Sequence, residues 1–165
     1  MNRILVAGIG NIFSGDDAFG VEVAQRLARR PQPDGVKVVD FGIRGLDLTY
    51  ALLDGYEAAI LVDAAARGHR PGTVTVVEPE PRVGRTLAPE DLMISGHDLD
   101  PAKVLDLVEA LGGGCGHIVL VACEPFDCGG EEGVMGLSPV VADAIEPAAA
   151  TVERLIAAFL GSEAV

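Results

Sequence analysis

The sequence lacks long apolar runs and an excess of positive charge, and each absence excludes a class of protein. Hydrophobic residues make up 49% of the 165-residue chain, but they fall in short segments, well below the ~20 residues of a membrane-spanning helix. Lys and Arg number 12 against 25 Asp and Glu, so the net charge is −13. A nucleic-acid backbone is bound by clustered Lys and Arg. We therefore expect neither a nucleic-acid nor a membrane partner and, without a secretory signal pattern, a cytoplasmic protein.

Cysteine is scarce as well. Cys115, Cys123 and Cys128 are spaced C-x7-C-x4-C, which matches neither a disulfide framework nor a CxxC metal or redox site. Cys123 lies in an apolar run and is predicted to be a small core residue, whereas Cys128 lies in a glycine-rich loop. No cysteine has a histidine partner that would indicate a thiol protease, so we predict that all three are dispensable for chemistry.

Three common motifs of α/β enzymes are missing. The sequence has no GxxxxGK[ST] phosphate loop and no GxSxG nucleophile turn, which argues against a P-loop enzyme and a serine α/β-hydrolase. Gly8 and Gly10 hint at a dinucleotide fold, but Phe13 stands where the third glycine is expected. A nucleotide or small-molecule enzyme using this turn remains a weaker alternative.

What the sequence does contain is an alternation of apolar strands and amphipathic helices. Strands are expected at 3–9, 36–41, 58–62, 73–77 and 118–122, and helices at 19–29, 46–53, 101–111 and 138 to about 160. Such alternation predicts one three-layer α/β/α domain spanning 1–165, with a mostly parallel sheet of about five strands. The short connection before 73–77 makes that strand a candidate for an antiparallel edge, and Pro147 should kink or split the last helix.

The stretch from Arg3 to Gly20 combines a buried strand, a glycine-rich turn and two adjacent carboxylates. An apolar run bounded by glycines is typical of a central strand covered on both faces. Asp16 and Asp17 come directly before a helix, where the helix dipole and capping favour an acidic residue. Taken alone, the pair is therefore compatible with a purely structural role.

Acidic residues lie at or just after the carboxyl ends of four of the predicted strands. They are Asp17, Asp40, Asp63 and Glu124. The carboxyl ends of parallel strands share one edge of a sheet, which is the usual place for a ligand. His97, in a Ser-Gly-His loop before a helix, can reach the same edge. Two carboxylates and an imidazole suit a first-row divalent metal, although a lone histidine such as His97 is more often a surface or helix-capping residue than a ligand. His69 and His117 are interpreted as structural.

Several segments together resemble the hydrogenase maturation endopeptidases. The stretch Gly8-Ile9-Gly10-Asn11-Ile12-Phe13-Ser14-Gly15-Asp16-Asp17 is similar to the N-terminal signature of that family. Further similarity lies at 40–45, 61–64, 95–97, 136–139 and 145–147, so the resemblance covers nearly the whole chain. These enzymes remove a C-terminal extension from the large subunit of [NiFe] hydrogenases. The resemblance implies that the precursor of such a subunit is the partner of this chain.

The resemblance also implies roles for individual residues. The positions that would act in catalysis and contact metal are Asp17, Asp63 and His97. Asp16 is assigned to capping or to support of its neighbour. The substrate-binding loop would consist of Asp40, Gly42, Ile43 and Arg44, and the pair Ile43-Arg44 departs from the Thr and small residue of many relatives.

In this family nickel arrives already loaded in the precursor, so no permanently bound cofactor is expected. Nickel held by the three residues would bring the scissile bond close to a water activated either by a carboxylate or by the metal. The family is classified as aspartic-type, whereas the ligand set resembles a metal-dependent site. An alternative of another class is a nickel-sensing chaperone or docking module that holds the precursor without cleaving it.

Overall fold

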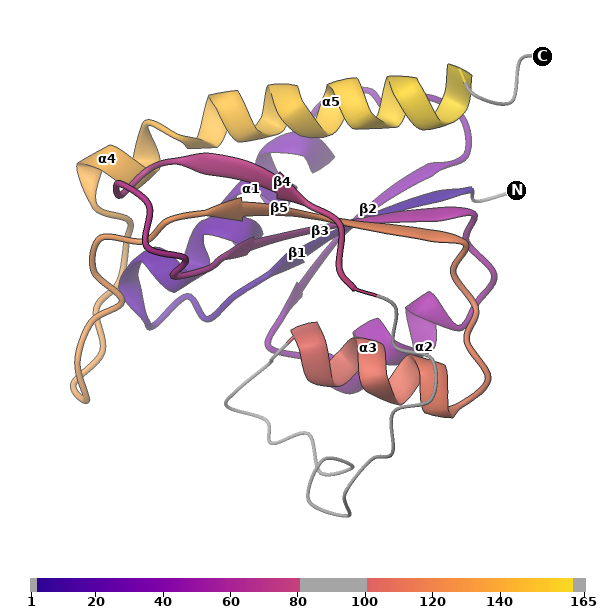
Figure 1. The fold of residues 1–165 in the computed structure, drawn as a ribbon. Helices are drawn as coiled ribbons and strands as arrows, with labels where there is room; N and C mark the ends of the chain where they lie inside the picture. Colours follow the sequence, from indigo (N-terminus) through magenta and orange to yellow (C-terminus); the bar gives the residue numbers. More distant parts are fainter. Residues whose placement is uncertain (1–2, 81–100, 162–165) are drawn as a thin grey trace.

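The computed structural model describes residues 3–80 and 101–161, and it contains one five-stranded sheet (Figure 1). The strands are β2 (Val36–Gly42), β1 (Ile4–Ile9), β3 (Ala58–Ala64), β5 (His117–Cys123) and β4 (Val74–Val77), in that spatial order. The first four run parallel to their neighbours, and β4 pairs antiparallel with β5. The predicted mostly parallel sheet and the antiparallel edge at 73–77 are both confirmed.

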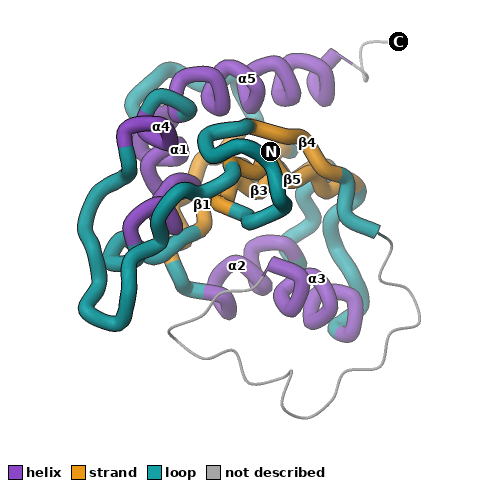
Figure 2. Tube along the Cα trace, turned by 60° about the vertical axis from the view of Figure 1, so that its left-hand side comes forward, coloured by secondary structure: helices purple, strands orange, loops and turns teal. Residues whose placement is uncertain are grey.

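Helices cover both faces of the sheet. Figure 2 shows α1 (Phe19–Ala28) and α5 (Ile145–Gly161) above the sheet, with α2 (Gly45–Leu52) and α3 (Pro101–Ala110) below it. Alternate residues of a strand point to opposite faces, so β1 contributes to two cores. Val6 packs with the α1 and α5 side, while Leu5 packs with the α2 and α3 side. The three-layer α/β/α prediction is therefore confirmed.

The last helix is split before its proline. A short helix, α4 (Pro139–Ala142), is followed by α5, which begins at Ile145. Pro147 is the third residue of α5, where a backbone N–H would have no partner within the helix. The last helix was expected to be kinked or split at Pro147; it is split, but the break comes ahead of the proline, between Ala142 and Ile145. No helix in the described ranges is long and apolar enough to cross a bilayer.

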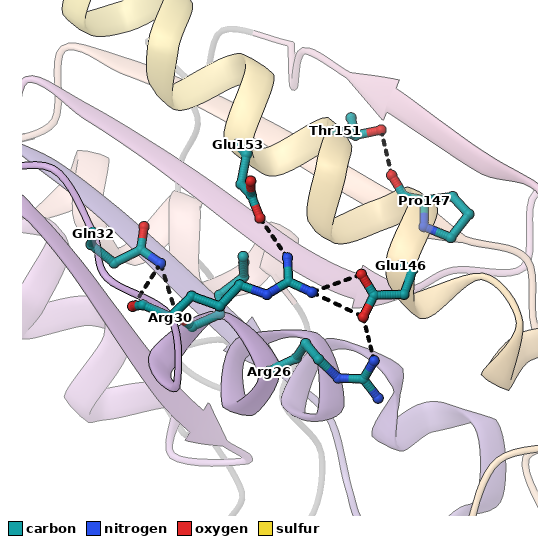
Figure 3. A network of polar contacts seen from close by, with 8 residues as sticks. Arg26, Arg30, Gln32, Glu146, Pro147, Thr151 and Glu153 are labelled. Atoms are coloured by element: carbon teal, nitrogen blue, oxygen red, sulfur yellow. Dashed lines mark hydrogen bonds and ion pairs between the residues drawn. The ribbon is translucent and has the colours of Figure 1, made fainter.

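Ion pairs join the two helices on the upper face. Figure 3 shows Arg30 of the α1 C-terminal turn bound to Glu146 and Glu153 of α5, and Arg26 bound to Glu146. The hydrogen bonds from Arg30 and Arg26 hold the pKa of Glu146 below its usual range. These side chains are exposed, so solvent screens their attraction. The ion pairs orient α5 along α1, and the hydrophobic contacts of the buried core beneath them hold the two helices together.

Candidate active site

The loops that follow β1, β2, β3 and β5 all lie at the carboxyl edge of the sheet, at the left of Figure 1. After β1 the chain turns through a short 3-10 helix, η1 (Gly15–Ala18), and enters α1. Gly20 makes this path possible, because a Cβ there would stand 1.9 Å from the carbonyl oxygen of Val62. Glycine thus lets the start of α1 lie directly against the end of β3.

Asp17 is held in a tight turn after β1. Its Oδ2 accepts a hydrogen bond from the backbone N–H of Asn11 at 3.0 Å. Gly10 has a φ of +150°, and a Cβ at that position would stand 1.9 Å from the Asp17 carbonyl oxygen. The turn therefore folds back on itself and fixes the half-buried Asp17 side chain beside the end of β1.

Asp63 lies inside β3, opposite Ala122 of β5, although the sequence predicts that the strand ends at Val62. The side chain belongs to a residue that is only 8% exposed, and Oδ1 accepts a hydrogen bond from the N–H of Ala64 at 2.8 Å. Gly8 of β1 pairs with Val62 of β3, so Asp63 lies one residue beyond this pairing. Asp17, in η1 after β1, and Asp63, in the neighbouring strand β3, thus both lie at the predicted edge.

The third predicted residue, His97, lies outside the described residues. Within 3–80 and 101–161, no three His, Cys, Asp or Glu residues are grouped so that they would hold a metal ion. The described part of the chain places two of the three predicted ligands, Asp17 and Asp63, at the same edge of the sheet. The metal-contacting and catalytic roles of all three stay predictions.

Asp16, next to Asp17, has a different environment. It is fully buried, and Oδ2 accepts hydrogen bonds from the backbone N–H groups of Phe126 and Asp127 at 2.9 and 2.8 Å. Oδ1 accepts one from the N–H of Ser138 at 2.7 Å, and the Ser138 hydroxyl donates as well. Burial alone would raise the pKa of Asp16, but these donors outweigh it and the pKa lies below its ordinary value. Asp16 thus anchors both ends of the β5–α4 loop.

The predicted substrate-binding loop, residues 40–44, lies beside this turn, because the N–H of Gly10 donates to the carbonyl oxygen of Gly42 at 3.0 Å. Asp40 accepts a hydrogen bond from the Gln25 amide at 3.2 Å. The Arg44 guanidinium donates to the backbone carbonyls of Phe41 and Asp40, which stiffens the loop. The substrate-binding role of these residues stays a prediction.

Glu124 also lies at the carboxyl edge, but its carboxylate serves the fold. It accepts hydrogen bonds from the backbone N–H groups of Arg67 and Gly68 at 2.7 and 3.2 Å. The bond from Arg67 is the main cause of the lowered pKa of Glu124. The residue therefore holds the β3–β4 connection. The sequence places four acidic residues at strand ends, and it does not show that Glu124 has a structural role while Asp63 is a candidate ligand.

The cysteines and His117 occupy the positions that their sequence context predicts. Cys123 is fully buried, and burial raises the pKa of its thiol to about 11. Cys128 is exposed in the loop after β5. His117, at the opposite end of β5, has its Nε2 3.3 Å from Glu78 Oε1 and its ring centroid 5.2 Å from that of Phe159. That the cysteines are dispensable stays a prediction.

The sequence did not predict the contact between Ser138 and Asp16. Ser138 binds Asp16 through both its N–H and its hydroxyl across 122 residues of chain. No local pattern signals such a contact, because a Ser-Pro pair before a helix already has a capping explanation.

Known proteins resemble this chain in both sequence and structure. A family model described as hydrogenase maturation protease matches residues 21–155. The chain is 35% identical over 147 residues to the hydrogenase expression/formation protein HupD of Bradyrhizobium diazoefficiens, covering 88% of this chain and 73% of that protein. It is 32% identical over 158 residues to the hydrogenase 2 maturation protease of Escherichia coli, covering 95% and 90%.

Solved structures agree with these sequence matches. The maturating endopeptidase HybD of Escherichia coli superimposes with a TM-score of 0.74 at 30% identity, over 98% of this chain and 94% of that one. The [NiFe] hydrogenase maturation protease HycI of Thermococcus kodakarensis gives 0.65 at 25% identity, over 92% and 90%. With a buried acidic anchor, two carboxylates at the sheet edge and these matches, the chain belongs to the hydrogenase maturation protease family of peptidases.

Proposed function

We propose that this protein is an endopeptidase that removes the C-terminal extension of a nickel-loaded [NiFe] hydrogenase large-subunit precursor. The observation that carries the proposal is that Asp17, in the turn after β1, and Asp63, in the adjacent parallel strand β3, both lie at the edge where ligands bind in such sheets. Family membership makes proteolysis the chemistry to expect at that edge.

In this proposal nickel is part of the substrate. Asp17, Asp63 and His97 contact it, since carboxylate and imidazole groups both serve as ligands of first-row divalent metals. Nickel held at the sheet edge brings the scissile peptide bond beside the same carboxylates. The attacking water loses its proton to a carboxylate, as in aspartic-type hydrolysis, or is activated by the metal itself.

The loop formed by residues 40–44 is proposed to bind the precursor polypeptide next to the nickel. The Arg44 side chain is 57% exposed, yet its bonds to Asp40 and Phe41 fix where it lies. A rigid loop with one cation presents a defined surface to a peptide. The proposal places the reaction in the cytoplasm, where the precursor polypeptide is synthesised.

Purified precursor, prepared with and without nickel, tests the proposal. We expect the C-terminal peptide to be released from the nickel-loaded form alone, as detected by mass spectrometry. Stable binding of the loaded precursor without peptide release would contradict the proposal and support a holding module instead. Equal cleavage of both forms would remove nickel from recognition while leaving a peptidase.

A further inference from the structure

Two neighbouring loops at the carboxyl edge expose large apolar side chains. Among the described residues, ten large hydrophobic side chains are exposed, and five of them lie on these two loops. The five, here called the apolar patch, are Ile12, Phe13, Phe126, Val134 and Met135. Phe13 is 61% exposed, and Phe126 and Met135 are each 69% exposed. Scattered apolar residues need no explanation, but five on neighbouring loops indicate an interaction surface.

Backbone hydrogen bonds join the two loops into one unit. The N–H of Val134 donates to the Phe13 carbonyl at 2.9 Å, and the N–H of Gly15 donates to the Val134 carbonyl at 2.7 Å. Ser14 and Val134 form a parallel bridge. In Figure 1 the β5–α4 loop is the long orange loop at the left. The apolar patch is therefore carried by paired backbone instead of by two independent loops.

The apolar patch is also fixed relative to the candidate active site. Asp16 binds the beginning of the β5–α4 loop through the N–H groups of Phe126 and Asp127, and its end through Ser138. Asp17 is the next residue along the chain. A protein held on the apolar patch is consequently positioned with respect to Asp17 through one buried carboxylate.

The two described segments that carry the apolar patch have charge of a single sign. Asp127, Glu131 and Glu132 are exposed on the same loop, and are here called the acidic rim. The sequence contains no Lys or Arg from 104 to 153 or from 4 to 25, so the segments that carry the apolar patch contribute no cation. A complementary surface must therefore bring apolar side chains together with Lys or Arg.

We propose that the apolar patch with its acidic rim is the docking surface for the precursor, and that it holds a segment of the precursor rich in apolar and basic side chains. This inference rests on the proposed function, and it adds the place where the precursor is gripped while its nickel faces Asp17 and Asp63. Phe and Met are enriched in the centres of protein interfaces. Rim charges steer a partner of opposite sign.

Steady-state cleavage and equilibrium binding test the docking surface together. The variants are Phe13→Ser, Met135→Ser and the double charge reversal Glu131→Lys/Glu132→Lys. Leu111→Ser and Glu109→Lys are matched controls, since both residues are exposed near the end of α3, at the opposite edge of the sheet. All six positions are exposed, so we expect thermal unfolding to remain close to that of the unaltered protein.

We expect each apolar variant to raise the KM for nickel-loaded precursor by about tenfold, as truncation of an interface anchor does. The kcat should change by less than about twofold, because binding energy made equally in ground and transition states affects KM alone. The unaltered protein should bind more weakly as salt screens the acidic rim, and the charge-reversed variant should lose that salt dependence. The controls should match the unaltered protein.

Binding of nickel-free precursor separates the two proposals. It measures docking without the nickel contacts and without cleavage, and we expect the docking variants to raise its Kd by about tenfold. If the unaltered protein cleaves and both Kd and KM stay unchanged in the docking variants, the docking surface is wrong and the peptidase proposal stands. If the protein binds precursor through the apolar patch but releases no peptide, the docking surface stands and the peptidase proposal is wrong.

Discussion

Two adjacent carboxylates at the turn after β1 have opposite tasks. Asp16 is buried, and both of its carboxylate oxygens accept hydrogen bonds, from the backbone N–H groups of Phe126, Asp127 and Ser138. Asp17 is half-buried, and its carboxylate accepts a hydrogen bond from the N–H of Asn11. The family resemblance places Asp17 at the metal-contacting position and assigns Asp16 to capping or to support of its neighbour. The contacts of Asp16 show that its carboxylate anchors the β5–α4 loop, and its support of Asp17 stays a prediction.

Replacing Asp63 by Asn should abolish processing without destabilising the fold. Asn keeps the size of the side chain and an oxygen for the N–H of Ala64, but it lacks the negative charge that a divalent cation requires. We expect peptide release to fall by orders of magnitude. The melting temperature should stay level or rise, since charges kept for function often reduce stability. Mass spectrometry and thermal unfolding of the same preparation provide the measurement.

Asp54→Asn is the matched control for this substitution, because Asp54 is exposed after α2 and away from the carboxyl edge. It should behave like the unaltered protein in both assays. Near-normal release by a folded Asp63→Asn variant would remove Asp63 from the site.

Asp16→Asn should mainly destabilise the protein. The amide nitrogen of Asn would face backbone N–H donors that now bind a carboxylate, and disrupting hydrogen bonds to a buried charged group lowers the free energy of unfolding by about 2–4 kcal/mol. The folded-state pKa of Asp16 is lowered from its ordinary value of 3.8. Its contribution is therefore complete above that pH and is lost as the pH falls through the folded-state pKa.

Urea unfolding between pH 2.5 and 7 checks both parts. The free energies of the unaltered protein and the Asp16→Asn variant should differ most at neutral pH and converge in acid. A constant difference across that range would show that the carboxylate charge contributes nothing to the anchor.

At the level of helices and strands, composition predicts which elements form and pairing decides where they end. The apolar runs of β1 and β3 are evident in the sequence, and both strands were predicted. The extension of β3 through Asp63 and Ala64 was not predicted, because it depends on partners in β5 that are nearly 60 residues away. The split between α4 and α5 likewise comes before Pro147, a place that no single residue marks.

The contact between α1 and β3 yields a prediction at this scale. A Cβ at residue 20 would stand 1.9 Å from the Val62 carbonyl oxygen and 2.4 Å from that of Ile9. Backbone must move, so Gly20→Ala should destabilise the fold by about 2–3 kcal/mol, as overpacking typically does. It should also lower kcat by displacing η1 from the end of β3.

Gly161→Ala, at the end of α5, is the control, because nothing lies within 4 Å of a Cβ placed there. Denaturant unfolding and peptide release are measured for both variants. A Gly20→Ala variant of normal stability and activity would show that the close approach of α1 to β3 is unimportant.

For the whole molecule, the fold class and the family were accessible from the sequence because both depend on pattern. Alternating strands and helices predict the layers, and the glycine-rich turn with its acidic pair carries the family resemblance. The roles of Asp16 and Glu124 were not accessible in the same detail. Both roles depend on backbone N–H groups of distant segments that donate hydrogen bonds to the carboxylates. Ser138 donates to Asp16, and Arg67 donates to Glu124.

Both cores share the sheet, so the domain should unfold as one unit. Val6 and Ile60 pack on one face while Leu5 and Leu61 pack on the other, and losing either face exposes the same strands. Amide hydrogen exchange should therefore show the slowest protons in β1 and β3, with a common opening free energy for the two faces. Separate free energies for the α1–α5 side and the α2–α3 side would contradict this expectation.

The anchoring of the β5–α4 loop has a consequence for how such a protein diversifies. Asp16 and the pairing of Phe13 with Val134 fasten the loop at both ends, which leaves residues 128–133 as a closed segment. Changing the length of a closed loop alters its closure entropy only slowly. On the proposed function, residues inserted or exchanged there would change partner preference while Asp17 and Asp63 keep their places at the sheet edge.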